Sequence, residues 1–162
     1  MVIVFKAKNV GFYVQFNDTP TANDIIKGLP IEGIVSKWGD EIYFKTGIDA
    51  AGDGRTTDLN VGDVAYWPEG QCLCMFYGPT QAITELKPVP ASPVIIVGKT
   101  MASPDELREI HEGERISVFV FAKKEYAMAV ENPYDDNRRL SQSEIDELVR
   151  KLLSEKEKGG VI

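Results

Sequence analysis

Residues 62–80 constrain this chain most, because they place large aromatic side chains on both sides of a tight turn. Two apolar runs are joined at residues 67–71, where Pro68 and Gly70 stand two positions apart. Proline presets φ near about −65° and glycine supplies a positive φ, so the pattern predicts a turn between two strands. Large aromatic side chains are costly to leave in water. We therefore expect them to line either a core or a pocket.

The composition favours one globular domain with an acidic surface. Of the 162 residues, 43% are hydrophobic and 27% are charged, which is typical of a folded domain. The net charge of −7 argues against a nucleic-acid partner, since phosphate contact requires a basic surface. The basic pairs at 123–124 and 138–139 are interpreted as solvated charge.

The sequence predicts neither a membrane span nor a secretory leader. Its apolar runs are far shorter than the about 18 residues that a membrane helix needs. Residues 1–6 carry no basic leader and no small-residue cleavage site. We therefore expect no membrane partner and a cytoplasmic location.

The cysteines and the single histidine argue against a metal site, and no cofactor is predicted. Cys72 and Cys74 stand two apart on an expected strand and so share one face. With His111 as the sole histidine, this pair cannot complete a tetrahedral zinc site. A catalytic thiol would need a nearby base, and His111 lies far along the chain. Buried structural thiols are the favoured interpretation.

Short strands dominate the first 122 residues. Apolar and aromatic runs predict strands, and Thr, Gly and Pro signals at 21–30 and the capping box Ser103–Glu106 predict two short helices. Strands are expected at 1–8, 10–16, 31–37, 41–46, 94–100 and 116–122, besides the two in 62–80, with long loops at 48–61 and 81–93. Many strands with few helices favour a mainly β fold, a closed antiparallel barrel capped by short helices.

Residues 123–162 are expected to form an extension with an amphipathic helix. After a linker at 132–137, apolar side chains recur at helical spacing: Ile145, Leu148, Val149, Leu152 and Leu153. Such a stripe is typical of a helix with one buried face. It would pack on its own barrel, on a second copy in a homodimer, or on a partner protein.

Three motifs resemble the small prokaryotic cyclophilin-like family, long known as a domain of unknown function. They lie at 38–44, at 62–70 and at 74–80, and the resemblance covers about residues 1–122. It implies an eight-stranded cyclophilin-like barrel. Glu69 departs from the family's usual proline, and residues from 123 onward extend beyond the family's typical end. The arginine beside a Phe-His pair that true cyclophilins use for catalysis has no match here, so the resemblance leaves open whether the chain is an enzyme.

Aromatic residues near one carboxylate suggest a binding pocket. Glu41 and Tyr43 share one face of an expected strand and are the candidate catalytic residues. Aromatic walls supply contact area and a single acid fixes the orientation of a small, partly apolar ligand. The expected ligand-binding residues are Trp38, Glu41, Tyr43, Tyr66, Trp67, Gln71 and Thr80. The alternative is that the aromatic residues plug the barrel ends and that Glu41 is solvated.

The sequence thus leaves three functions open. The first is a barrel that binds a small molecule or peptide in this pocket. The second is a peptidyl-prolyl isomerase with a non-standard site, since isomerisation needs little beyond desolvation and a donor to the prolyl nitrogen. The third is a protein-interaction module that uses the C-terminal helix.

Overall fold

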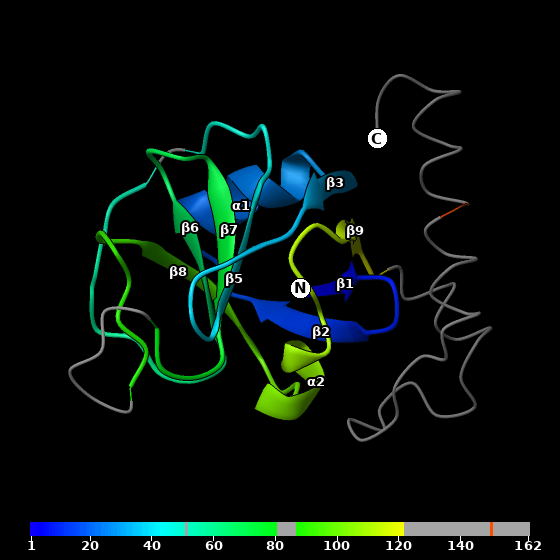
Figure 1. Cartoon of the computed structure of the whole chain (residues 1–162). Helices are drawn as coiled ribbons and strands as arrows, with labels where there is room; N and C mark the ends of the chain where they lie inside the picture. Colours follow the sequence, from blue (N-terminus) through cyan, green and yellow to red (C-terminus); the bar gives the residue numbers. More distant parts are fainter. Residues whose placement is uncertain (51, 81–86, 122–149, 151–162) are drawn as a thin grey trace.

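The structure is a computed structural model that describes residues 1–50, 52–80, 87–121 and 150 (Figure 1). These residues form nine strands and two helices, and every strand pair is antiparallel. The strands are β1 (Val2–Lys6), β2 (Gly11–Phe16), β3 (Ile31–Ile34), β4 (Ser36–Lys37), β5 (Glu41–Lys45), β6 (Asp63–Trp67), β7 (Cys72–Phe76), β8 (Ile95–Thr100) and β9 (Arg115–Val120). The mainly β expectation is confirmed.

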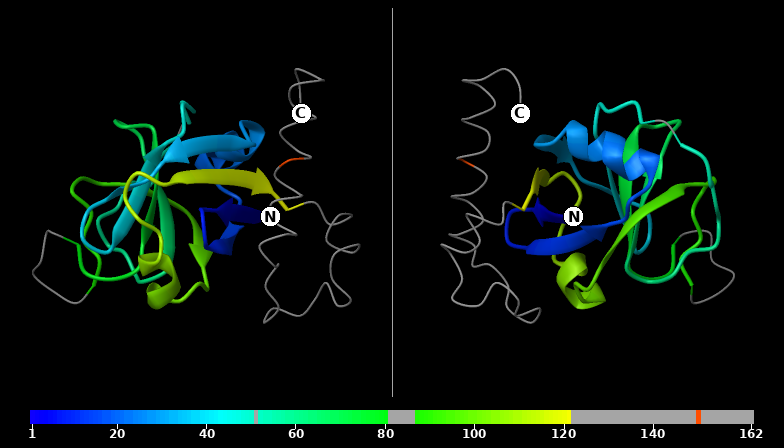
Figure 2. Two further views of the ribbon diagram at one scale, coloured as in Figure 1. Left: turned by 45° about the vertical axis from the view of Figure 1, so that its right-hand side comes forward. Right: turned by 180° about the vertical axis from the view of Figure 1, so that it is seen from behind.

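The strands curl into a nearly closed barrel. Their order is β3-β9-β1-β2-β8-β6-β7-β5-β4, so the two edge strands are consecutive in the sequence and only Val35 separates them. The helices α1 (Pro20–Lys27) and α2 (Pro104–Arg108) lie at opposite ends of the barrel (Figures 1 and 2). Among the described residues, no helix is long and apolar enough to cross a membrane.

The expected single strand at 31–37 is wrong in one respect. The chain divides there into β3, which pairs with β9, and β4, which pairs with β5. Val35 lies between them, is 1% exposed, and its N–H donates to the Glu114 carbonyl. One expected strand therefore becomes two strands with different partners, which raises the strand count to nine from the eight that the family resemblance implies.

Local capping signals fix both helices. The Thr19 hydroxyl accepts from the Ala22 N–H at the start of α1, which begins one residue earlier than the expected helix at 21–30. At α2, Ser103 and Glu106 form the expected capping box in both directions. The helix α2 ends at Arg108.

The turn between β6 and β7 is present, but its geometry differs from the expectation. The residue with positive φ is Gln71, at 52°, and not Gly70. Position 70 requires glycine for a steric reason, because a β-carbon there would lie 2.5 Å from two ring carbons of Trp67. The turn therefore uses Gly70 to let the Trp67 indole lie against the backbone.

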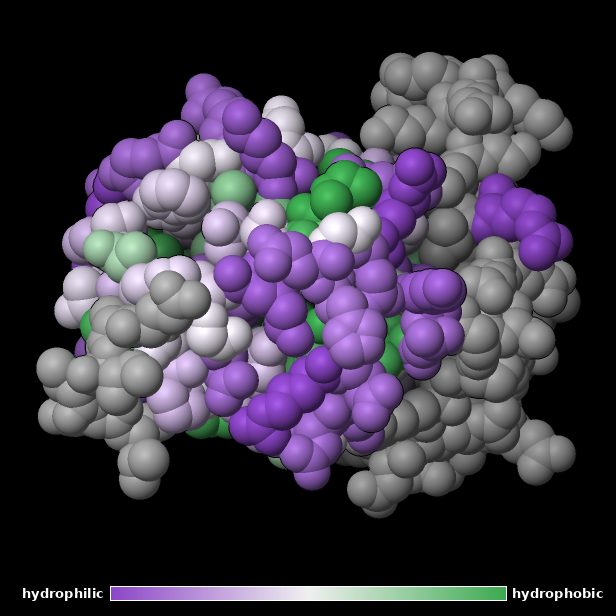
Figure 3. All heavy atoms as spheres, in the orientation of Figure 1, coloured by the Kyte–Doolittle hydropathy of each residue, from purple (hydrophilic) through white to green (hydrophobic). Residues whose placement is uncertain are grey.

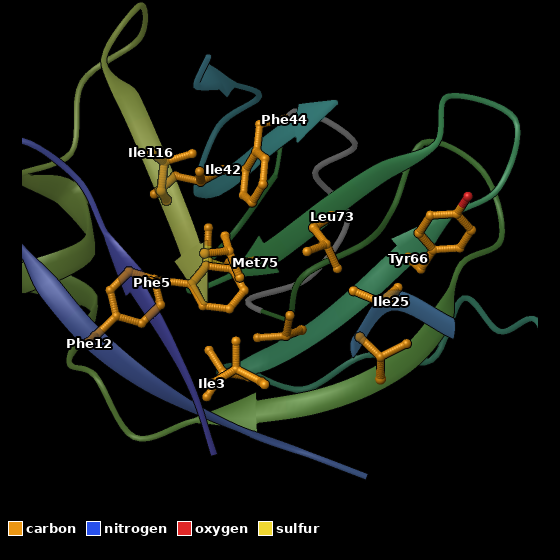
Figure 4. Packing of buried hydrophobic residues seen from close by; sticks show 14 of the residues in the cluster. Ile3, Phe5, Phe12, Ile25, Ile42, Phe44, Tyr66, Leu73, Met75 and Ile116 are labelled. Carbon is orange, nitrogen blue, oxygen red and sulfur yellow. The ribbon is translucent and has the colours of Figure 1, made fainter. Parts of the chain in front are cut away.

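The barrel interior is filled by one hydrophobic core. It takes side chains from nearly every strand and from α1 (Figure 4). Phe5 contacts Phe12 with stacked rings, at a centroid distance of 5.3 Å, and Phe44 edge-on, at 6.1 Å. A second, smaller cluster lies on the other face of β6 and β7 and contains Leu59, Ala65, Cys72, Cys74, Phe76 and Val94. It forms the base of the site described next.

The expected helical extension lies outside the described residues, apart from Arg150. The apolar stripe from Ile145 to Leu153, the oligomeric state and the proposed docking of this helix remain predictions.

Candidate functional site

The site lies on the outer face of the barrel, where β5, β7 and β6 are neighbours. Side chains alternate along a strand, so Tyr43 and Cys74 point outward while their neighbours fill the core. The register places Tyr43 opposite Cys74, and Cys74 opposite Ala65. Two small side chains thus lie beside a large tyrosine, and Trp67 follows two positions after Ala65 on the same face. The difference in size leaves a hollow between the aromatic rings.

This hollow is a pocket of about 210 Å³. Its lining residues are Trp38, Glu41, Tyr43, Trp67, Cys74, Pro90, Ala91, Ser92 and Val94. A cavity needs about 10–15 Å³ of such volume to hold one water, so this pocket has room for several waters. It is smaller than a typical drug-binding pocket of about 300–1,000 Å³. The dimensions suit a small metabolite or a single side chain of a peptide.

The segment 90–94 forms one wall of the pocket and is held by backbone and side-chain hydrogen bonds. Val94 and Thr56 exchange two backbone hydrogen bonds, of 2.8 and 3.0 Å. Just before the wall, the Val89 carbonyl accepts a 2.5 Å hydrogen bond from the Thr80 hydroxyl. The wall is therefore tied to residues that follow β7 and to the long loop before β6.

Glu41 is the ionisable acid of the pocket. Only 7% of it is exposed, and burial raises the pKa of its carboxyl from 4.5 to about 7, opposed by a hydrogen bond from the Cys74 thiol. The acid and the carboxylate are therefore both populated near neutral pH. A group with that property can act as a general acid or base, or can change the charge of a binding site.

The thiols of Cys72 and Cys74 are buried and have low reactivity. Burial raises the pKa of Cys74 well above its ordinary value, and the nearby Glu41 carboxyl acts in the same direction. Burial also raises the pKa of Cys72. Since the thiolate is the nucleophile, both side chains are poor nucleophiles at neutral pH. This agrees with the expectation of buried structural thiols.

The indole N–H of Trp67 is a hydrogen-bond donor without a described partner. Its indole Nε1 is buried and finds no acceptor among the described residues. A buried donor without a partner costs about 1–3 kcal/mol. Because Nε1 is covered by protein atoms, a ligand could accept from it only after the indole or its neighbours move.

The structure separates the seven sequence-predicted ligand-binding residues into two groups. Trp38, Glu41, Tyr43 and Trp67 line the pocket. Tyr66, Gln71 and Thr80 are not among its lining residues.

Each residue of the second group has another role. Tyr66 belongs to the barrel core, where its hydroxyl donates to the Ile48 carbonyl at 2.5 Å. Gln71 occupies the β6–β7 turn, and its carbonyl accepts hydrogen bonds from Thr46. Thr80 fastens the pocket wall through Val89. The period of two on β6 could have shown that Tyr66 and Trp67 face opposite ways.

Sequence reasoning did not assign Cys74, Pro90, Ala91, Ser92 or Val94 to the pocket. For Cys74 the alternation along β7 indicated the face, because Cys74 and Cys72 are two positions apart and so point to the same side of the sheet. No local sequence pattern placed residues 90–94 at the pocket, since their position depends on the bridge between Val94 and the distant Thr56.

No Lys, Arg or His belongs to the described pocket lining. Three arginines of the described chain pair with carboxylates elsewhere: Arg55 with Glu69, Arg108 with Asp40 and Asp105, and Arg115 with Glu32. Within the described ranges, no group of three or more His, Cys, Asp or Glu side chains could hold a metal ion. The chemistry of the pocket thus depends on one acid, aromatic rings and neutral polar groups.

The fold defines a class, a small antiparallel barrel of the cyclophilin type. A family model described as Cyclophilin-like matches residues 1–119, and the chain belongs to this cyclophilin-like family. It is also similar to the solution structure of a hypothetical protein from Archaeoglobus fulgidus, with 30% sequence identity and a TM-score of 0.63. That match covers 74% of this chain and 93% of the other. A search of curated proteins gave no match.

Proposed function

We propose that this barrel is a binding protein whose outer-face pocket holds a small molecule or one side chain of a peptide. The observation that carries the proposal is the meeting of Trp38, Tyr43 and Trp67 around the buried Glu41 carboxyl. Apolar walls with a few polar groups that fix orientation are the usual composition of a ligand pocket.

The surrounding surface favours the pocket over a broad apolar interface. In the view of Figure 3, the described surface is mainly hydrophilic and its hydrophobic patches are small and separate. The described part of this face therefore offers no broad apolar interface, which supports a small ligand.

Intrinsic fluorescence tests the proposal directly. Trp38 and Trp67 are the two tryptophans of the chain, and both line the pocket. A library of metabolites and short peptides should contain ligands that change this fluorescence and raise the melting temperature. Glu41→Gln and Tyr43→Phe should weaken those effects. Tyr66→Phe is the matched control, because its hydroxyl lies in the core. If Glu41→Gln and Tyr43→Phe respond like the wild type, as Tyr66→Phe should, the pocket assignment is wrong.

Prolyl isomerisation at the same pocket is a second candidate, supported by an aromatic lining that a proline ring could contact; the buried Nε1 of Trp67 would serve as donor only after the indole moves to expose it. An N–H donated to the prolyl nitrogen reduces amide resonance and lowers the barrier of about 20 kcal/mol. A protease-coupled assay on a Xaa-Pro peptide tests this candidate, with Trp67→Phe as the variant that lacks the donor. A rate equal to the uncatalysed rate would exclude it and leave the binding proposal untouched.

A further inference from the structure

The pocket holds an acid without a described counter-charge. Glu41 is buried, and its partner is the Cys74 thiol, which donates a hydrogen bond but brings no positive charge. The described lining includes no cationic side chain. A buried charge is costly unless it is paired. A ligand with a positive charge would supply that pair, whereas an anionic ligand would be repelled.

The walls of the pocket favour a cation as well. Trp38, Tyr43 and Trp67 come from three different elements: the turn after β4, strand β5 and strand β6. The faces of such rings attract cations, tryptophan most strongly, and the attraction increases when the cation is desolvated. The net charge of −7 adds a long-range field that favours approach of a positive ligand.

The large carbon share of the lining favours one type of cation. A primary ammonium is strongly hydrated and carries three N–H donors that each need an acceptor. Much of this lining is carbon, including Pro90, Ala91 and Val94. Methyl groups on the nitrogen would remove the donors and would present apolar surface to those walls. The pocket therefore suits a methylated ammonium better than a free amine.

We propose that the outer-face pocket binds a methylated ammonium cation, with the Glu41 carboxylate as counter-charge and the three aromatic rings as a cage. This inference rests on the proposed binding function and specifies its ligand class. A volume of about 210 Å³ admits a trimethylammonium headgroup with a short tail.

Choline and its neutral isostere test the role of charge. In dimethylbutanol a quaternary carbon replaces the choline nitrogen, so shape is kept and charge is lost. Titration of the full chain, followed by tryptophan fluorescence and calorimetry, should show choline and tetramethylammonium binding about tenfold more tightly than dimethylbutanol. Glu41→Gln should weaken choline binding about tenfold and leave dimethylbutanol unchanged.

A pH series adds an independent readout. Choline affinity should increase between about pH 5 and about pH 8, as the Glu41 carboxyl ionises, while dimethylbutanol affinity stays constant. The other titratable groups on the outer face of β5, β6 and β7 are Tyr43, Lys45, Asp63, Cys72 and Cys74. The Asp63 carboxylate accepts a hydrogen bond from the Asn60 N–H. Burial raises the pKa of both thiols, which keeps them neutral across this range.

Four outcomes decide between the two proposals. Dimethylbutanol binding as tightly as choline, or a choline affinity indifferent to Glu41→Gln, overturns the methylated-ammonium inference and leaves a neutral-ligand pocket standing. No response to choline or tetramethylammonium also overturns it. If the wider ligand library yields no compound whose effect depends on Tyr43 or Glu41, the proposed binding function fails too.

Discussion

Replacing Glu41 by glutamine should stabilise the protein at alkaline pH and not at acid pH. Burial raises the pKa of this carboxyl from 4.5 to about 7. The native state therefore binds its proton more tightly than the unfolded state does. Between these two pKa values the native state holds more protons, so the contribution of Glu41 to stability is present below about pH 4.5 and is lost as pH rises through about 7.

The magnitude follows from the same values. A pKa difference of about 2.5, at 1.36 kcal/mol for each pH unit, corresponds to about 3 kcal/mol. Glu41→Gln removes this cost, so its free energy of unfolding relative to the wild type should rise by about 3 kcal/mol between about pH 4 and about pH 8. With an m-value of about 2 kcal/mol/M, the urea midpoint should shift by about 1.5 M.

Urea unfolding at four pH values measures the effect. The quantity of interest is the wild-type-to-variant difference at each pH, because groups other than Glu41 cancel in it. Glu109→Gln, which changes an exposed glutamate, is the matched control and should show no such trend. A Glu41→Gln effect that is the same at every pH would refute the assignment of Glu41 as a buried acid with a raised pKa.

Three further substitutions test other parts of the site and fold. Tyr66→Phe should cost about 1–2 kcal/mol in urea unfolding, because it removes the hydrogen bond to Ile48, yet ligand affinity should not change. Gly70→Ala should shift the tryptophan emission and weaken ligand binding, since its β-carbon collides with the Trp67 ring; unchanged emission would contradict this. Ser103→Ala should cost about 1 kcal/mol and lower the melting temperature by about 3 °C, measured by calorimetry, through loss of the capping box; an unaltered melting temperature would argue against the cap.

Features set by neighbouring residues were readable from the sequence. The capping box at Ser103, the turn after Trp67 and the outward pair of Glu41 and Tyr43 each depend on spacings of two to four residues. The division of the strand at Val35 was not readable, because it depends on β9, which lies at the other end of the barrel sequence. Nor was the pocket wall at 90–94, which is positioned by a distant bridge.

The inclusion of both Tyr66 and Trp67 among the expected ligand residues shows a different limit. Both are aromatic and both belong to the same motif, but adjacent residues of a strand face opposite sides of a sheet. Both side chains have the aromatic character expected of a pocket, but the alternation along β6 allows only one of them to line it. Here it is Trp67 that does so.

The position of β9 has a consequence for the order in which the barrel is completed. This strand lies between β3 and β1, pairing Val118 with Ile31 and Val120 with Ile3. During synthesis, β1 and β3 are made early. Each keeps an edge without its β9 partner until residues 115–120 have been synthesised. Such edges are templates for pairing with another chain. The time between synthesis of β3 and synthesis of β9 is thus the interval in which the growing chain is most exposed to misassembly, and truncations before residue 115 should aggregate.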